Sequence, residues 1–154
     1  DAVDGNTFYI YKTGYLYAST DGGVTWVQKN ATAIPNKNSY LFVAARPGTN
    51  GEVWVSLDNN GLYKTTNGGT TFTKVTALST ATAFSWGAPT VFCYGTVSGV
   101  KGMYRSTDLG ASWDQIDNGT EKFPAGVKGL AGDRQVFGRV YVGTGGRGVL
   151  YGQP

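Results

Sequence analysis

The side chains best suited to acid–base chemistry in this chain of 154 residues are carboxylates. The chain has no histidine and a single cysteine, so a serine or cysteine nucleophile activated by imidazole is not expected. Two carboxylates facing a substrate can act as general acid and general base. The candidates are Asp1, Asp4, Asp21, Glu52, Asp58, Asp108, Asp114, Asp117, Glu121 and Asp133.

None of these carboxylates forms a convincing catalytic pair in the sequence. Asp21 and Asp108 belong to a repeated turn, which commits them to backbone hydrogen bonds. Asp133 stands beside Arg134, where we expect a salt bridge or a turn. The remaining internal aspartates are expected in a turn or on the solvated end of a strand: Asp58, Asp114 and Asp117.

Metal and cofactor binding have no signature in the sequence. A transition-metal site of the usual imidazole or thiolate kind is not expected without histidine and with one cysteine. A calcium site built from loop oxygens stays open, although no ligand spacing indicates one. Cys93 lies in an apolar strand, where we expect a small buried hydrophobe. We therefore expect no cofactor and no metal.

A short motif occurs three times and sets the organisation of the chain. Its pattern is Ser/Thr-x-Asp/Asn-x-Gly-x-x-aromatic, and a tyrosine stands two residues before each copy. The spacing of roughly 40–50 residues indicates one repeated supersecondary unit. The motif residues are Ser19, Asp21, Gly23 and Trp26, then Thr65, Asn67, Gly69 and Phe72, then Ser106, Asp108, Gly110 and Trp113.

Turn chemistry explains every fixed position of this motif, which we call the box. The Asp or Asn side chain can accept backbone N–H groups about two residues on. The glycine permits a positive φ, and the aromatic residue returns into a strand, where it can pack between neighbouring units. We therefore predict a structural role for each box.

The elements around the boxes are strands. The chain is rich in glycine, tyrosine and phenylalanine, and no segment keeps a helical apolar period. We predict an all-β fold, with four antiparallel strands in each complete unit, as in β-propeller blades. The expected blade units span about 1–34, 35–79, 80–121 and 122–154. The predicted strands are Thr7–Lys12, Tyr15–Thr20, Val24–Lys29, Tyr40–Arg46, Glu52–Leu57, Leu62–Thr66, Thr71–Thr76, Ala81–Trp86, Thr90–Thr96, Gly102–Thr107, Ser112–Ile116, Val127–Ala131, Arg139–Thr144 and Gly148–Tyr151.

Two complete blades flanked by two three-stranded ones do not close a ring by themselves. A repeat buries its faces only against neighbours, so we expect further blades or a second copy of the chain as partner. The 13 basic residues are scattered and give a net charge of +3, so nucleic acid is not an expected partner. No run of 18 apolar residues indicates a membrane span.

The last third of the chain carries a specific resemblance. It contains Phe84-Ser-Trp86-Gly-Ala-Pro89, the third box, Gly132-Asp133-Arg134, and finally Gly138-Arg-Val-Tyr-Val-Gly-Thr-Gly-Gly-Arg-Gly-Val-Leu-Tyr-Gly152. In this order the segments closely resemble the carboxyl end of glycoside hydrolase family 74, the xyloglucanases and oligoxyloglucan-specific cellobiohydrolases. The resemblance covers essentially the whole chain. The box, known as the Asp-box or BNR repeat, also occurs in sialidases and sortilin-like receptors.

The resemblance implies a fold and a function. Enzymes of that family have two seven-bladed propellers and cleave the β-1,4-glucan backbone of xyloglucan with inversion, using one aspartate from each propeller. Those aspartates lie in an Asp-Ile/Val-Gly-Gly context, which this chain lacks. The chain then corresponds to the last half of the second propeller of a secreted enzyme, without either catalytic residue and inactive alone.

What remains for this chain is sugar contact. Aromatic faces stack on pyranose rings, and the aromatic candidates outside the boxes are Trp86, Trp54 and Tyr40. Core packing is the alternative for each, and it is favoured for Trp54 because this residue lies mid-strand. Asn30 and Asn118 begin N-glycosylation sequons, which are compatible with secretion. A lectin-like module or an interaction scaffold that closes by oligomerisation is the competing hypothesis.

Overall fold

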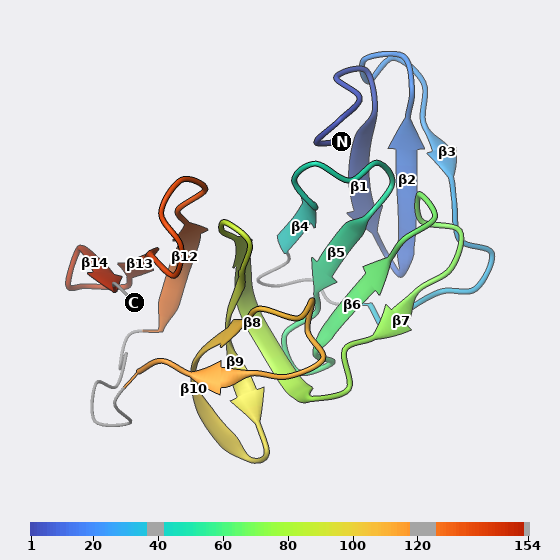
Figure 1. Ribbon diagram of the computed structural model, residues 1–154. Coiled ribbons are helices and arrows are strands. Elements are labelled where there is room, and N and C mark those ends of the chain that lie inside the picture. Colours follow the sequence, from blue (N-terminus) through green and yellow to red (C-terminus); the bar gives the residue numbers. More distant parts are fainter. Residues whose placement is uncertain (37–41, 118–125, 153–154) are drawn as a thin grey trace.

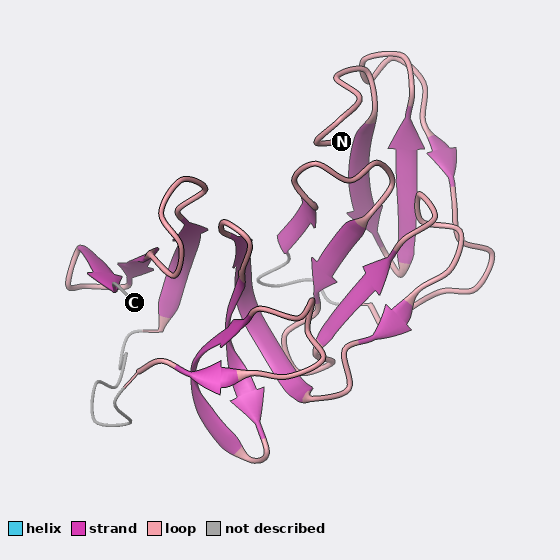
Figure 2. Ribbon diagram, viewed as in Figure 1, coloured by secondary structure: helices cyan, strands magenta, loops and turns pink. Residues whose placement is uncertain are grey.

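The computed structural model describes residues 1–36, 42–117 and 126–152, and within them it contains strands and no helix (Figure 2). The fourteen strands form four antiparallel sheets in which each strand pairs with its sequence neighbour. Sheet 1 contains β1 (Phe8–Lys12), β2 (Tyr15–Ser19) and β3 (Val27–Gln28), and sheet 2 contains β4 (Phe42–Ala45), β5 (Val53–Ser56), β6 (Leu62–Thr65) and β7 (Thr73–Lys74). Sheet 3 contains β8 (Leu78–Trp86), β9 (Val91–Val97), β10 (Val100–Ser106) and β11 (Asp114–Gln115), and sheet 4 contains β12 (Val127–Gly132), β13 (Val140–Thr144) and β14 (Val149–Gly152).

The all-β prediction is confirmed, and each predicted strand has an observed counterpart. The strands that follow the boxes are shorter than expected, with only two residues each. The cause is local, because the box holds the preceding backbone in a turn. In the first box, for example, the backbone N–H groups of Val24 and Thr25 bind the Asp21 carboxylate instead of a neighbouring strand.

The four sheets follow one another around an arc, from sheet 1 at the amino end to sheet 4 at the carboxyl end (Figure 1). Strand β5 shows how the interior is built, because all four of its residues are buried. Side chains alternate between the two faces of a strand. Val53 and Val55 therefore join a cluster with sheet 1, while Trp54 joins a cluster with sheet 3.

Three apolar clusters fill the three spaces between consecutive sheets. Between sheets 1 and 2 lie Tyr11, Leu16, Val53, Val55 and Leu57. Between sheets 2 and 3 lie Trp54, Leu62, Val75, Leu78, Ala81, Phe84, Trp86, Val91 and Cys93. Between sheets 3 and 4 lie Ala83, Phe92, Tyr94, Met103, Val127, Val140 and Val142. Each sheet therefore buries its face against a neighbour, as a repeat architecture requires.

The outer faces of the first and last sheets are uncovered. On β1, Phe8 and Ile10 are 46% and 44% exposed. On sheet 4, Tyr141 lies opposite Tyr151 across the strand pair, and both rings are exposed. On the interior sheets the exposed large hydrophobic residues among those described are Val100 and Ile116, both on sheet 3 or at its edge, so most of this exposure lies at the ends of the arc. No helix of the described chain is available to cross a membrane.

Candidate functional site

The box is a hydrogen-bonded turn whose centre is a buried hydroxyl. In the third copy, the Ser106 hydroxyl is buried, donates to the Asp108 carboxylate at 2.9 Å and accepts the Gly110 backbone N–H at 2.8 Å. Asp108 in turn accepts the Ser112 backbone N–H at 2.9 Å and the Ser112 hydroxyl. The Ser106 hydroxyl and the Asp108 carboxylate are thus engaged by groups of the turn itself.

The second box reproduces this geometry with an amide. Asn67 accepts the Thr65 hydroxyl at 2.9 Å and the Thr71 backbone N–H at 3.0 Å. Its amide nitrogen donates to the Thr71 hydroxyl, whereas the hydroxyls facing Asp21 and Asp108 donate to the carboxylate. The second box therefore needs no charge to form.

The two carboxylate boxes should make stability depend on acid pH. Hydrogen bonds from Thr25 and Ser112 lower the pKa of Asp21 and Asp108 from 3.8 to about 2. Folding thus favours the ionised carboxylate, so the box contribution is complete above the ordinary pKa and is lost as pH falls from about 4 toward 2. We expect the double variant Asp21→Asn, Asp108→Asn to flatten this part of the profile.

Urea unfolding midpoints measured between pH 5 and 2 check this expectation. Asn67→Asp is the matched control and should add acid sensitivity to the second box.

Asp108→Ala should lower the melting temperature by a few degrees at neutral pH, because turn N–H groups lose their acceptor. An unchanged melting temperature together with lost sugar binding would contradict the structural role of the box.

The second and third boxes also join their own sheets to the preceding ones. A side chain at Gly69 would meet Leu16 of sheet 1 at 2.5 Å, and one at Gly110 would meet Trp54 of sheet 2 at 3.1 Å. Phe72 and Trp113 pack against the same two intersheet clusters. In the first box, a side chain at Gly23 would contact only Trp26, at 3.9 Å, and Trp26 is 37% exposed. The first box thus presents a surface that the other two boxes bury.

The structure places Trp54 and Trp86 together in the core. Their ring centroids are 4.9 Å apart in an edge-on arrangement, and Trp54 is fully buried. No face of the Trp54 ring is open to a sugar in this structure, which agrees with the core-packing alternative. Trp86 is 5% exposed and borders a small pocket, so its contact with a ligand stays a prediction. Tyr40 and Asn118 lie outside the described residues.

Asn30 has a structural role instead of the predicted glycosylation. It is 2% exposed, and its amide oxygen accepts the Leu16 backbone N–H at 2.8 Å. Its amide nitrogen donates to the carbonyls of Gly14 and Thr32. An amide held on both sides in the interior is not accessible to a glycan in the folded chain.

Two carboxylates that could have served in an open site, Asp133 and Glu52, are instead held by neighbouring groups. Asp133 accepts the backbone N–H groups of Gln135 and Val136, and it pairs with Arg139 at 3.5 Å, not with the adjacent Arg134. Glu52 is buried between Arg46 and Trp54. Within the described ranges, no cluster of three or more potential metal ligands occurs. The buried Cys93 thiol has a raised pKa because burial disfavours the thiolate.

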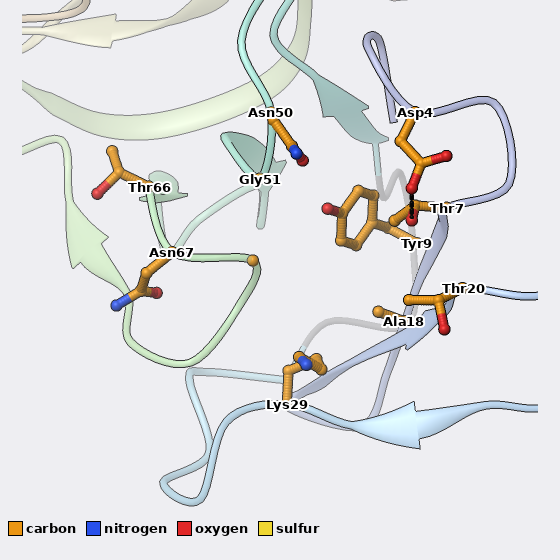
Figure 3. A pocket seen from close by; sticks show the side chains of 11 residues that line it. Asp4, Thr7, Tyr9, Ala18, Thr20, Lys29, Asn50, Gly51, Thr66 and Asn67 are labelled. Atoms are coloured by element: carbon orange, nitrogen blue, oxygen red, sulfur yellow. Dashed lines mark hydrogen bonds between the residues drawn. The ribbon is translucent and has the colours of Figure 1, made fainter.

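A polar pocket lies between sheets 1 and 2, on the edge that carries the boxes (Figure 3). Its volume is about 340 Å³. The Tyr9 ring lies near its centre, with Asn50 on one side and Lys29 across from it, and the Thr7 hydroxyl donates to Asp4 at 2.8 Å. The rest of the wall comes from small residues, of which half have polar side chains: Ala18, Thr20, Gly51, Thr66, Asn67 and Gly68.

The chemistry of this pocket suits a sugar better than an apolar ligand. An aromatic ring, an amide, hydroxyls and one ammonium group can contact the ring face and the hydroxyls of a pyranose. Sequence reasoning missed these residues because it looked only for tryptophans and tyrosines near loops. The available signal was the threonine at the second position of each box, as in Thr20 and Thr66.

The four sheets are antiparallel meanders that follow one another in an arc, with box residues at the contacts between sheets. This arrangement defines a segment of a β-propeller. No family model matches the chain. A xyloglucanase of Acetivibrio thermocellus is 37% identical over 161 residues, which are 100% of this chain and 19% of that protein. The crystal structure of a GH74 enzyme from Niastella koreensis superposes with a TM-score of 0.87 at 40% identity, over 98% of this chain and 23% of that one. A GH74 xyloglucanase from Xanthomonas campestris gives a TM-score of 0.85 at 28% identity, over 100% of this chain and 23% of that one.

The resemblance to glycoside hydrolase family 74 is therefore confirmed along the whole chain. The chain spans about a fifth of the length of the curated relatives that it matches.

Proposed function

We propose that this chain is the carboxyl-terminal half of the second propeller of a secreted xyloglucan-degrading glycoside hydrolase. The parent enzyme would cleave the β-1,4-glucan backbone of xyloglucan with inversion. The observation that carries the proposal is the alignment with xyloglucanases across 98–100% of the chain at 35–37% identity. Location outside the cell and the substrate are both part of the proposal.

Within that enzyme, the role of this segment is to complete the propeller and to line part of the glycan surface. Inverting hydrolysis needs two carboxyl groups about 6.5–9.5 Å apart, with a sugar and a water between them. The described carboxylates cap turns, pair with arginine or lie on exposed strand ends, so none is offered as a catalytic group. The polar pocket around Tyr9 is the candidate sugar contact.

The chain by itself should release no reducing ends from xyloglucan. The expected rate is that of the buffer blank, because both catalytic carboxylates must come from other blades. The measurement is a reducing-end assay on the purified chain, with a full-length enzyme of the same family as positive control. Turnover that Asp133→Asn abolishes would show that the chain carries its own catalytic carboxylate.

The competing candidate is a non-catalytic lectin-like or protein-interaction propeller that closes by self-association. The exposed rings on the outer faces of sheets 1 and 4 favour it, since contiguous apolar patches normally find a partner.

We expect the isolated chain to associate through these faces. Light scattering measures this, and Ile10→Lys with Tyr151→Lys should return the chain to a monomer. A soluble wild-type monomer at high concentration would contradict the open-ring arrangement.

A further inference from the structure

A second pocket, of about 210 Å³, lies where three sheets meet, and its chemistry differs from that of the polar pocket. Three turns between the first two strands of a sheet contribute to it. Arg46 and Pro47 follow β4, the segment from Trp86 to Pro89 joins β8 to β9, and Arg134 follows β12. Leu109 of the third box completes the wall. We call this the arginine pocket.

The arginine pocket is built on backbone contacts between sheets. The Ala88 backbone N–H donates to the Asp133 carbonyl at 3.0 Å, which joins the turns of sheets 3 and 4. The Lys64 ammonium donates to the Leu109 carbonyl at 2.8 Å, which joins sheets 2 and 3. Gly87 and Thr90 close a tight turn with two reciprocal backbone hydrogen bonds. The wall is therefore fixed before any ligand arrives.

Two guanidinium groups border this pocket, and no carboxylate lines it. The Arg46 guanidinium is held in place by Glu52, because one of its terminal nitrogens pairs with the Glu52 carboxylate at 2.8 Å. Glu52 is 4% exposed and is held in turn by the Trp54 indole N–H at 2.9 Å. A guanidinium has five N–H donors, so this pairing leaves the other edge of Arg46 available.

Arg134 supplies the positive charge that is not compensated. It is exposed, and among the described residues it has neither an ion pair nor a side-chain hydrogen bond. Glu52 pairs with Arg46, so Arg134 is the one lining cation of the pocket without a counter-ion among the described residues. That charge matches a single carboxylate better than a phosphate dianion.

The rest of the wall favours a ligand that has an apolar or ring-shaped part beside its carboxylate. Pro47, Ala88, Pro89 and Leu109 offer no hydrogen-bonding side chains. Trp86 also borders the pocket, and its buried indole N–H has no acceptor within the described ranges. Because that nitrogen is shielded from solvent, Trp86 contributes aromatic surface to the wall and no donor.

From these observations we propose that the arginine pocket binds a carboxylate on a compact organic body, such as a free sugar acid or the uronic-acid residue of a polysaccharide. This site is separate from the polar pocket around Tyr9, and it does not depend on xyloglucan being the substrate. The polar pocket at the preceding junction carries both Asp4 and Lys29, so it lacks this preference for anions.

The test is a titration of the chain by NMR or calorimetry at low ionic strength, with sodium glucuronate as probe and glucose as neutral control. Glucuronate should bind and glucose should not. Arg134→Ala should weaken glucuronate binding by about tenfold, and added salt should weaken it further. Arg147→Ala, which removes an exposed cation from the β13–β14 turn, should leave the affinity unchanged.

Arg46→Gln provides a second variant, since it keeps a donor near Glu52 while removing the guanidinium. A uronic-acid oligosaccharide that binds more tightly than glucuronate identifies a polysaccharide as the source of the carboxylate. Equal affinity identifies a free acid. Equal binding of glucose, no saturable binding of glucuronate, or equal losses in Arg134→Ala and Arg147→Ala would each overturn the proposal.

Discussion

Replacing Trp54 by alanine should destabilise the chain by about 3–5 kcal/mol, the cost expected for truncating a large aromatic side chain in a core. The ring is fully buried and packs against Trp86 and Phe84, with ring centroids 4.9 Å and 6.4 Å away. The Lys64 ammonium lies 5.1 Å from its ring centroid. The substitution would leave a cavity and remove the indole hydrogen bond to the buried Glu52 carboxylate.

Equilibrium unfolding in urea, followed by near-ultraviolet circular dichroism, measures this effect. Trp26→Ala is the matched control, because it truncates the same side chain at an exposed position. We expect it to cost about 1 kcal/mol or less. Trp54→Phe should fall between the two, since it keeps most of the ring and loses the contact with Glu52. Similar losses in Trp54→Ala and Trp26→Ala would show that Trp54 is not central to the core.

Gly69→Ala should destabilise the chain by about 1–3 kcal/mol more than Gly23→Ala, although the two glycines occupy the same position of the repeated turn. Their φ angles are +96° and +94°, so the backbone strain of a side chain is the same at both. The difference is packing. A side chain at Gly69 collides with the buried Leu16 and with Lys29, whereas one at Gly23 has space.

The same pair of variants tests the assembly. If a further blade precedes sheet 1 in the complete protein, it should pack on the first box as sheet 1 packs on the second. Gly23→Ala should then become nearly as destabilising as Gly69→Ala in the full-length protein. Thermal unfolding of both variants in both contexts measures this. A Gly23→Ala variant that stays harmless in the full-length protein would rule out a blade at that face.

Local chemistry was predictable because it repeats within the sequence. The box pattern predicted the turns around Asp21, Asn67 and Asp108, since a short acceptor side chain and a glycine with positive φ specify a turn without distant contacts. Alternating β-branched and aromatic residues predicted the strands. The length of the strands after the boxes was overestimated, because pattern alone does not show which N–H groups the box retains.

The candidate binding surfaces were not predictable in the same way. The polar pocket joins Tyr9 to Asn50 and Thr66, and the arginine pocket joins Arg46 to Arg134. These residues are far apart in the chain and are brought together only by the stacking of successive sheets. The role of Asn30 was missed for a similar reason. Its sequon is local, whereas its partners Leu16 and Gly14 are reached only after the chain turns back.

The sequence by itself determined the repeat, the strand order within each sheet and the kinship with glycoside hydrolase family 74, because each depends on residues close together or in fixed order. Only the tertiary structure decided which faces are buried. Trp54 and Trp86 have the residue type of a sugar platform, yet the packing of sheet 2 on sheet 3 directs both into the core. Burial is a property of the assembled sheets, so a strand that alternates in sequence does not reveal what its second face meets.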